Sequence, residues 1–378
     1  MGVLTDARAK PALPFAGTHR LVDFPLSNCA NTGISDVWVV QQYEPHALED
    51  HLANGRPWDL DRTNGGLLLL PPFEGREDQD RGGWHKGNAD ALWRHRALLA
   101  EAEAEVVLVL SADAVYAMDY APLIREHVAF GADVTMAVTR VVCEDPGRFG
   151  VVQVGEDSRV RDFAYKPDEA LGDLVTMEVF AYRPEALLDT LGALAAEGEK
   201  LADFGHGLLP ALVDAGSAFA HRFDGYWRDV GTPTSYWQAH QDLLHGSLLE
   251  SLSDRAWPIR GAAGTRFPAF VTGDAVVQDS LLSPGCHVAG RVVRSVIGPG
   301  VRVAEGAEVV DAVVLDEAEV GVGARVAHAV VDARVKIGPA AKVGAPRGSG
   351  DLTVLGAGAV VPEGKEVQAG DELAAAFP

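Results

Sequence analysis

Two aspartates stand where a carboxylate could hold a metal ion against a phosphate. Asp113 closely follows the strongly apolar run Val106–Leu110. Asp229 lies between an Arg and a Gly turn in the aromatic-rich run Tyr226–Thr232. Mg²⁺ at phosphate sites takes one or two protein carboxylates together with substrate oxygens, so the pair predicts a magnesium site. An aspartate after a strand is also a common turn or helix-capping residue, so Asp113 alone would be weak evidence.

Several cations could hold an anion beside these carboxylates. Arg8, Lys10 and Arg20 lie close together near the start of a chain that is otherwise acidic. Such a local cluster favours an anion site over a merely solvated basic face. Lys166 precedes Pro167, and this fixed turn could aim the ammonium at a sugar phosphate, although a lone exposed lysine would have the same sequence.

Two segments begin in a manner that suits ligand contact. The run Gly87–Ala91 starts a helix with small residues and with Asn88 and Asp90 near its N-terminus, where a nucleotide could approach closely. Asp203 and Phe204 precede an amphipathic helix in a similar manner. An ordinary capped helix would look the same in both cases.

The elements that must position these residues alternate between strands and helices up to about residue 235. Three apolar runs, Val37–Val40, Val106–Leu110 and Val134–Val138, predict buried parallel strands. A Gly-rich loop that includes Arg81–Gly83 and a helix over residues 90–103 separate the first two. A strand hairpin is predicted over 149–163, and a connecting helix over 233–249. This order predicts an open sheet with ligands at the carboxyl ends of its strands.

The last third of the chain repeats every six residues. Ile297, Val303 and Val309 are six apart, and so are Val320 and Val326, with Gly after several of the aliphatic residues. Such a period predicts a parallel β-helix whose coils must stack to bury their aliphatic corners. A Val- and Gly-rich sandwich is the alternative. The predicted organisation is a sheet domain over 1–235, a connecting helix and linker over 236–264, and a β-helix over 265–378.

Composition limits the class of protein. A length of 378 residues indicates two domains, and a net charge of −22 argues against nucleic acid or an anionic membrane as the main partner. Cys29, Cys143 and Cys286 lack CxxC spacing, so we expect free thiols rather than disulfides or structural zinc. No targeting segment or membrane span is visible, and we expect a cytoplasmic protein.

The chain resembles the bacterial ADP-glucose pyrophosphorylase (glucose-1-phosphate adenylyltransferase) family from near its second residue to its end. The matching blocks are Leu4–Phe15, Arg20–Cys29, Gln42–Tyr43, Trp84–Ala91 and Tyr226–Trp237. The resemblance implies an α/β nucleotide-diphosphosugar transferase domain, with a Rossmann-like mixed or parallel sheet, followed by a left-handed β-helix. It also implies a homotetramer regulated by sugar phosphates, which makes ADP-glucose and pyrophosphate from ATP and glucose 1-phosphate with Mg²⁺ for glycogen synthesis.

The resemblance assigns a role to each candidate residue. Asp113 and Asp229 match the metal carboxylates, with Lys10 as a further catalytic residue on the nucleotide side. Gly87, Asn88 and Asp90 also match nucleotide-side positions. The residues matching glucose 1-phosphate positions are Lys166, Thr176, Asp203, Phe204 and Trp227. Arg8 and Arg20 match basic positions of the effector pocket.

The chain departs from the family pattern at several points. The family's opening strand and Gly-rich phosphate loop would precede Leu4, where only three residues stand, so we expect an N-terminally truncated or divergent member. Ala114 replaces a His beside Asp113, Tyr165 replaces a Glu, Glu178 replaces a Gly of the sugar pocket, and Phe180 replaces a Tyr.

Three functions therefore compete. The leading one is ADP-glucose synthesis, and a catalytically weak regulatory paralogue, paired with a full-length copy, is the main rival. A pyrophosphorylase for another sugar 1-phosphate is suggested by Tyr165 and Glu178. An acyltransferase is disfavoured, because His287 and His328 are not accompanied by an acceptor site.

Overall fold

The computed structural model describes most of the chain. The described residues are 1–71, 85–141, 145–169, 172–197, 201, 203–262 and 264–375. The predicted loop at Arg81–Gly83, together with Trp84 and Cys143, lies outside them. Cys29 and Cys286 are free, buried thiols, as expected.

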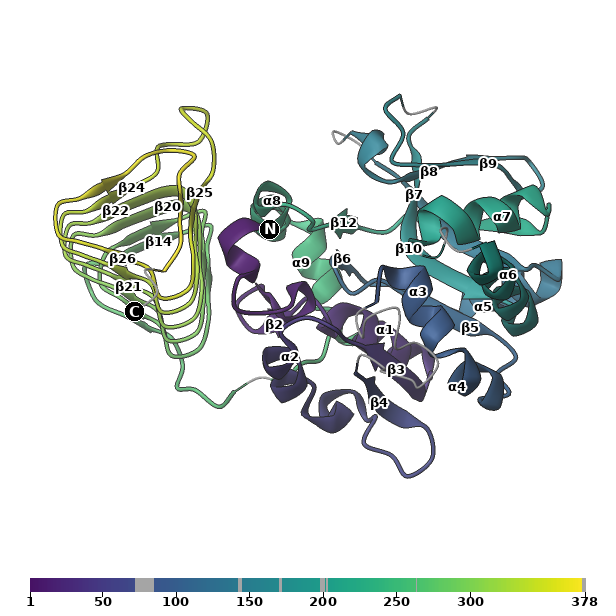
Figure 1. The fold of residues 1–378 in the computed structure, drawn as a ribbon. Helices are drawn as coiled ribbons and strands as arrows, with labels where there is room; N and C mark the ends of the chain where they lie inside the picture. The colour runs from purple at the N-terminus through teal and green to yellow at the C-terminus, as the bar shows by residue number, and fades with distance from the viewer. Residues whose placement is uncertain are drawn as a thin grey trace.

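A six-stranded mixed sheet forms the centre of the first half of the chain (Figure 1). Its strands follow the order β11-β7-β10-β8-β9, and β5 also pairs with β10. They are β5 (Val107–Leu110), β7 (Val134–Arg140), β8 (Gly150–Val154), β9 (Val160–Tyr165), β10 (Leu174–Tyr182) and β11 (Ala218–Arg222). The predicted hairpin is confirmed, because β8 and β9 pair antiparallel.

The strand directions differ from the prediction of an open parallel sheet. β10 runs antiparallel to both β5 and β7, and only β7 and β11 form a parallel pair in this sheet. The reason is the β8–β9 hairpin, which returns the chain to β10 without a crossover helix. An apolar run of residues does not encode the direction of its strand, so the sequence could not reveal this reversal.

Helices cover both faces of the sheet. The face that includes Met136 and Phe180 packs against α6 and α7, whereas Ala137 and Val179 pack with Leu123 of α5 on the other face. The helices of this half are α1 (Asp23–Thr32), α2 (Pro45–Leu52), α3 (Asn88–Arg94), α4 (Arg96–Glu101), α5 (Ala121–Phe130), α6 (Pro184–Glu197) and α7 (Leu209–Asp214). The single helix predicted over 90–103 is therefore two helices that meet at His95, whose backbone is not helical.

Three small sheets stand apart from the central one. They pair β1 (Pro14–Phe15) with β2 (His19–Arg20), β3 (Asp36–Val40) with β4 (Gly66–Leu70), and β6 (Ala114–Tyr116) with β12 (Trp227–Asp229). β3 and β4 are parallel, but within the described residues no strand joins them to β5. Consequently β3 and β5 are only partly buried, although their apolar sequences predict full burial.

Two helices lead to the second half of the chain. α8 (Pro233–Leu243) begins with a capping box formed by Thr232 and Ser235, and α9 (Ser247–Leu252) follows it. The predicted helix over 233–249 is interrupted because Gly246 adopts a φ of 122°, outside the helical region. The division at residues 235 and 265 stays a prediction.

A parallel β-helix forms the second half, as predicted. Its short strands are β13 (Phe270–Val271), β14 (Val276–Gln278), β15 (Leu281–Leu282), β16 (His287–Val288), β17 (Arg291–Val293), β18 (Val296–Ile297), β19 (Arg302–Val303), β20 (Glu308–Val314), β21 (Glu319–Val320), β22 (Arg325–Val331), β23 (Lys336–Ile337), β24 (Lys342–Val343), β25 (Thr353–Leu355), β26 (Val360–Val361), β27 (Glu366–Val367) and β28 (Glu372–Leu373). Within the described residues these strands pair parallel and in register, so equivalent aliphatic residues stack along the axis.

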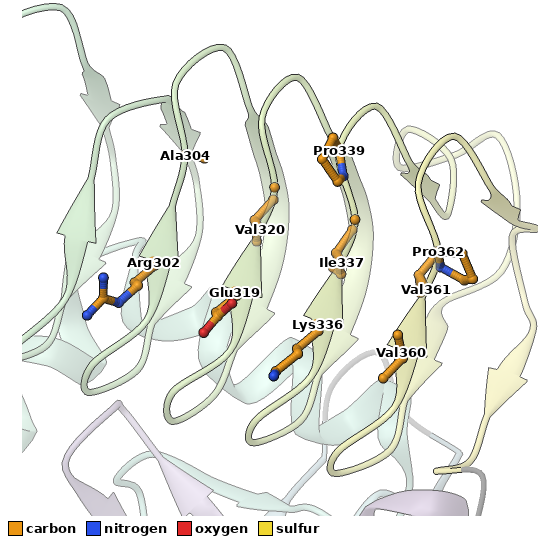
Figure 2. A pocket seen from close by; sticks show the side chains of 12 residues that line it. Arg302, Ala304, Glu319, Val320, Lys336, Ile337, Pro339, Val360, Val361 and Pro362 are labelled. Carbon is orange, nitrogen blue, oxygen red and sulfur yellow. The ribbon is translucent and has the colours of Figure 1, made fainter.

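Glycine follows several of these aliphatic residues because stacked coils approach closely. A Cβ atom on Gly321 would lie 2.8 Å from the carbonyl oxygen of Ile337 on the next coil. On the outer surface, Arg302, Glu319, Lys336 and Val360 occupy equivalent positions of successive coils and line a cavity of about 410 Å³ (Figure 2).

The two halves share an apolar interface. Leu4 and Phe15 from the start of the chain pack with Val313 and Val330 of the β-helix and with Trp237 of α8. The indole N–H of Trp237 donates to the backbone oxygen of Asp311 at 2.8 Å. None of the helices that the structure describes has the length and apolar character needed to span a lipid bilayer.

Candidate active site

The β6–β12 ladder brings the two predicted metal carboxylates together. Asp229 pairs with Ala114, and the N–H of Val230 donates to the backbone oxygen of Asp113 at 3.1 Å. Backbone geometry thereby fixes two residues that are far apart in the sequence close together, Asp113 directly before β6 and Asp229 at the end of β12. Both carboxylates remain partly accessible, with side-chain exposures of 31% for Asp113 and 19% for Asp229.

Lys10 joins the two carboxylates from a third segment. It begins the short 3₁₀ helix η2 (Lys10–Ala12), and its Nζ lies 2.7 Å from Oδ2 of Asp113 and 3.9 Å from Oδ1 of Asp229. The three residues that the sequence marked as catalytic are therefore in one place. This arrangement concentrates opposite charges where a phosphate and a cation could both be held.

Three further residues contact the two carboxylates. Arg148 approaches Oδ2 of Asp229 at 3.4 Å, and the hydroxyl of Ser111 donates to Oδ1 of Asp113. The N–H of Gly231 also donates to Asp229 at 3.0 Å. Burial raises the pKa of the Asp229 carboxyl, and Lys10 opposes that rise. Sequence reasoning missed Ser111 and Arg148; the position of Ser111 directly after an apolar strand is the one signal that could have identified it.

The predicted sugar-side residues Lys166 and Asp203 both contact Tyr165. The hydroxyl of Tyr165 donates to Oδ2 of Asp203 at 3.0 Å, and the Lys166 ammonium lies 4.7 Å from the centre of the Tyr165 ring. Asp203 also caps the π-helix η5 (Phe204–Leu208) through the N–H of Gly205. Tyr165 therefore occupies one oxygen of the carboxylate to which the resemblance assigns a sugar contact.

Glu178 is close enough to the two metal carboxylates and to the sugar-side Asp203 for their charges to act on its carboxyl. It lies in β10 at an irregularity between Thr176 and Phe180, and its φ of 56° is in the left-handed region. Burial, followed by the charges of Asp113 and Asp229, raises the pKa of the Glu178 carboxyl to about 7. The sequence identified Glu178 only as a departure from the family pattern.

The remaining predicted sugar residues belong to the surrounding framework. Thr176 is buried on β10, where its hydroxyl lies close to Gly150. Phe204 is buried and its ring contacts Phe180. Trp227 lies on β12 with its ring against Phe149, and its indole N–H has no hydrogen-bond partner within the described residues.

The predicted nucleotide-side residues lie at the start of α3. Gly87 precedes the helix, and the side-chain oxygen of Asn88 accepts the N–H of Phe204 at 2.8 Å, which ties α3 to η5. Asp90 points inward, where it accepts the N–H of Lys86 and the Nε–H of Arg94, both at 2.9 Å. Its carboxylate thus stabilises the helix start.

The two predicted effector residues lie between the halves of the molecule. Arg8 is buried and forms an ion pair with Asp332 of the β-helix. Arg20 donates to the backbone oxygen of Ala12 at 2.5 Å and to Nδ1 of His51 at 3.1 Å. Burial lowers the pKa of Arg20, and the nearby Asp316 carboxylate opposes that change.

The carboxylate pair suits a divalent ion with a preference for oxygen. Asp113 and Asp229 both face the Lys10 ammonium, so they already present oxygens to one positive centre. Within the described residues, no group of three or more His, Cys, Asp or Glu could hold a metal unaided. Substrate oxygens or water would complete the coordination, as is usual for Mg²⁺.

Sequence comparisons match both halves of the chain. The nucleotidyl transferase family model matches residues 3–246, and the model for the GlmU-like C-terminal hexapeptide matches residues 269–352. These matches confirm an α/β nucleotidyltransferase domain followed by a left-handed parallel β-helix.

Individual relatives are similar over most of the chain. The glucose-1-phosphate adenylyltransferase of Thermotoga neapolitana is 43% identical over 311 residues, which cover 82% of this chain and 73% of the relative. The enzyme of that name from Halalkalibacterium halodurans is 39% identical over 312 residues, covering 82% and 80%. That from Thermomicrobium roseum is 43% identical over 289 residues, covering 76% and 67%.

Proposed function

Because the chain belongs to the glucose-1-phosphate adenylyltransferase family, we propose that it transfers the adenylyl group of ATP to glucose 1-phosphate. A phosphate oxygen of glucose 1-phosphate attacks the α-phosphorus of ATP, and the bond from that phosphorus to the β,γ-pyrophosphate breaks. The products are ADP-glucose, a donor for glucan synthesis, and pyrophosphate. The convergence of Lys10, Asp113 and Asp229 is the observation that carries this proposal.

The chain's own residues have distinct tasks in this reaction. Lys10 neutralises phosphate charge, while Ser111 and the Gly231 N–H hold the two carboxylates in place. Mg²⁺ held by Asp113 and Asp229 would supply positive charge that stabilises the departing pyrophosphate. Preorganised charges of this kind accelerate phosphoryl chemistry because they need no rearrangement as charge develops.

We assign the sugar phosphate to the opposite side of this cluster. Lys166 would pair with its phosphate, and Thr176, Asp203, Phe204 and Trp227 would surround the ring. Gly87, Asn88 and Asp90 belong to the nucleotide side, where Asp90 acts through the fold of α3. Sugar-phosphate effectors would contact Arg20, and they would reach Arg8 by displacing Asp332. Assembly into a homotetramer is part of the same proposal.

A pyrophosphate-release assay tests the reaction. The chain is incubated with ATP, glucose 1-phosphate and Mg²⁺, and ADP-glucose is identified by chromatography. Turnover that depends on both substrates and on Mg²⁺ supports the proposal. Pyrophosphate release that continues without glucose 1-phosphate would contradict it.

A second candidate function follows from the separation of the β3–β4 sheet from β5. A chain with a divided sheet beside its carboxylates could serve as a catalytically weak regulatory subunit that assembles with an active copy. Mixing it with an active family member and measuring effector response would distinguish the two. A changed response without turnover by this chain alone supports the regulatory function.

A further inference from the structure

We propose that one face of the β-helix binds a second copy of this chain, with the two β-helices running in opposite directions. The face is the sheet formed by β13, β16, β19, β21, β23 and β26. The junction with the first half of the chain uses Val313 and Val330 of the other large sheet, so this face lies outside it. Such binding goes beyond the proposed reaction, and it would supply one interface of the proposed assembly, whether that is a dimer or a tetramer.

The outward side chains of this face form a single row across successive coils. Figure 2 shows its second half, where Arg302, Glu319 and Lys336 follow one another on neighbouring strands. Their charges alternate in sign along the β-helix. The complete outer row, in chain order, is Phe270, His287, Arg302, Glu319, Lys336 and Val360.

The charges of the outer row are not used within the chain. Arg302, Glu319 and Lys336 are exposed, and none of them forms an ion pair within the part of the chain that the structure describes. On the other large sheet, by contrast, Arg325 pairs with Glu308 of the preceding coil at 3.5 Å. The charges of the outer row therefore remain available to a partner with complementary charges.

The surroundings of the outer row suit close approach by another surface. Beside the row lie Ala304, Gly321 and Gly338, whose small size leaves a cavity of about 410 Å³. At the two ends, Phe270 and Val360 are each 61% exposed. Exposed apolar groups rimmed by charges are typical of protein–protein contact surfaces.

A two-fold axis that runs along the strands, between β19 and β21, makes the outer row complementary to itself. It would place Arg302 opposite Glu319 of the partner subunit and, by symmetry, Glu319 opposite Arg302 of the partner subunit. A two-fold axis along the β-helix would instead set each charge opposite its own copy, which repulsion between like charges disfavours. The charges thus favour two β-helices that run in opposite directions.

The outer positions of the row match in the same arrangement. Lys336 would lie opposite His287 of the partner subunit, and in each chain this imidazole stacks on the Phe270 ring with the ring centres 5.2 Å apart. An ammonium is attracted to an aromatic surface of this kind. Val360 would lie opposite Phe270 of the partner subunit, so the apolar ends of the row would cover each other.

Sedimentation velocity of the whole chain over a series of concentrations tests this arrangement. The proteins are the parent, Arg302→Glu, Glu319→Arg and the double variant Arg302→Glu/Glu319→Arg. Lys342→Glu is the control, because it reverses a charge at an exposed position of β24 in the other large sheet. Melting curves establish that each variant is folded.

We expect the parent to self-associate and the association to weaken at high salt, which screens exposed charges. Each single reversal should weaken it by about a hundredfold or more, since a symmetric interface contains the pair twice and like charges would face each other. The double variant should regain the association, because opposite charges again lie across the interface. Lys342→Glu should associate as the parent does.

A parent that sediments as a monomer at every concentration would overturn the proposal. So would a double variant that associates as weakly as the single reversals, because Arg302 and Glu319 would then not face each other between subunits. The measurement uses no substrate. A chain without nucleotidyl transfer can therefore still show this association, and an active chain can lack it.

Discussion

A single substitution at Asp229 can separate a role in metal binding from a role in folding. It accepts a hydrogen bond from Gly231 and faces Lys10 and Arg148. In Asp229→Asn the amide keeps the shape but loses the negative charge that would hold a metal ion. We expect an unchanged melting temperature and at least a hundredfold loss of Mg²⁺-dependent turnover in an active form of the protein, as for other electrostatic groups at reaction centres.

The exposed neighbour Asp224 provides the control for that experiment. Asp224→Asn removes the same charge from the same segment and should leave turnover within about twofold, because exposed charges interact weakly. If Asp229→Asn retained full pyrophosphate release, Asp229 would have only a structural role.

Glu178 should also make stability depend on pH. Its pKa is raised from 4.5 to about 7, so between these values the folded chain holds a proton that the unfolded chain has released. Stability therefore falls as the pH rises through this window, and the full loss, up to about 3 kcal/mol, is present above pH 7. Glu178→Gln removes the loss, and Glu178→Gly also relieves the backbone strain.

Calorimetric melting at pH 5 and pH 8 checks this prediction. Both variants should exceed the parent in melting temperature at pH 8, and the advantage of Glu178→Gln should shrink at pH 5. The additional gain of Glu178→Gly over Glu178→Gln should be the same at both values, because a backbone effect does not titrate. A pH-independent gain for Glu178→Gln would show that the carboxyl is not perturbed.

Among the elements, the β3–β4 pair stands apart from the central sheet, because within the described residues no strand joins it to β5. Both β3 and β5 are consequently only partly buried, although each is apolar enough for a fully covered strand.

Elements with a strong local signal could be predicted from the sequence. The six-residue spacing of Val303 and Val309 is sufficient for the β-helix, because each coil repeats the same burial pattern. The direction of β10 could not be predicted, since an apolar run is the same in either direction. The strained backbone of Glu178 also has no local signal, because tertiary contacts impose it.

The candidate site was predicted where single residues have characteristic chemistry. Lys10, Asp113 and Asp229 were each named as candidate site residues, and the structure brings the three together, while their catalytic roles stay predictions. The inward direction of Asp90 and the pairing of Arg8 with Asp332 depend on contacts between segments. Such contacts leave no trace in the local sequence.

At the scale of the whole molecule, the buried ion pair of Arg8 and Asp332 connects the two halves. The Arg8 side chain is 10% exposed and that of Asp332 is fully buried. Removal of one partner leaves an uncompensated buried charge, which typically costs about 3–5 kcal/mol. We therefore expect Arg8→Met to lower the stability by about this amount.

A double variant shows whether the lost stability comes from the broken ion pair or from changed side-chain packing between the two halves. In Arg8→Met/Asp332→Leu both charges are absent, so urea unfolding should show that most of the loss is recovered. If Arg8→Met alone were as stable as the parent, the junction would not depend on this pair.

The first residues of the chain pack against its last coils. The 3₁₀ helix η1 (Gly2–Thr5) lies against β25 and β28, and Leu4 is buried there among Val313, Val330 and Val354. During synthesis on the ribosome, the segment that precedes Lys10 therefore emerges long before β25 and β28, and it has no surface to pack on until these two strands have been made. Lys10 should thus be placed late in folding, and a nascent chain that stalls before β28 should hold it only loosely.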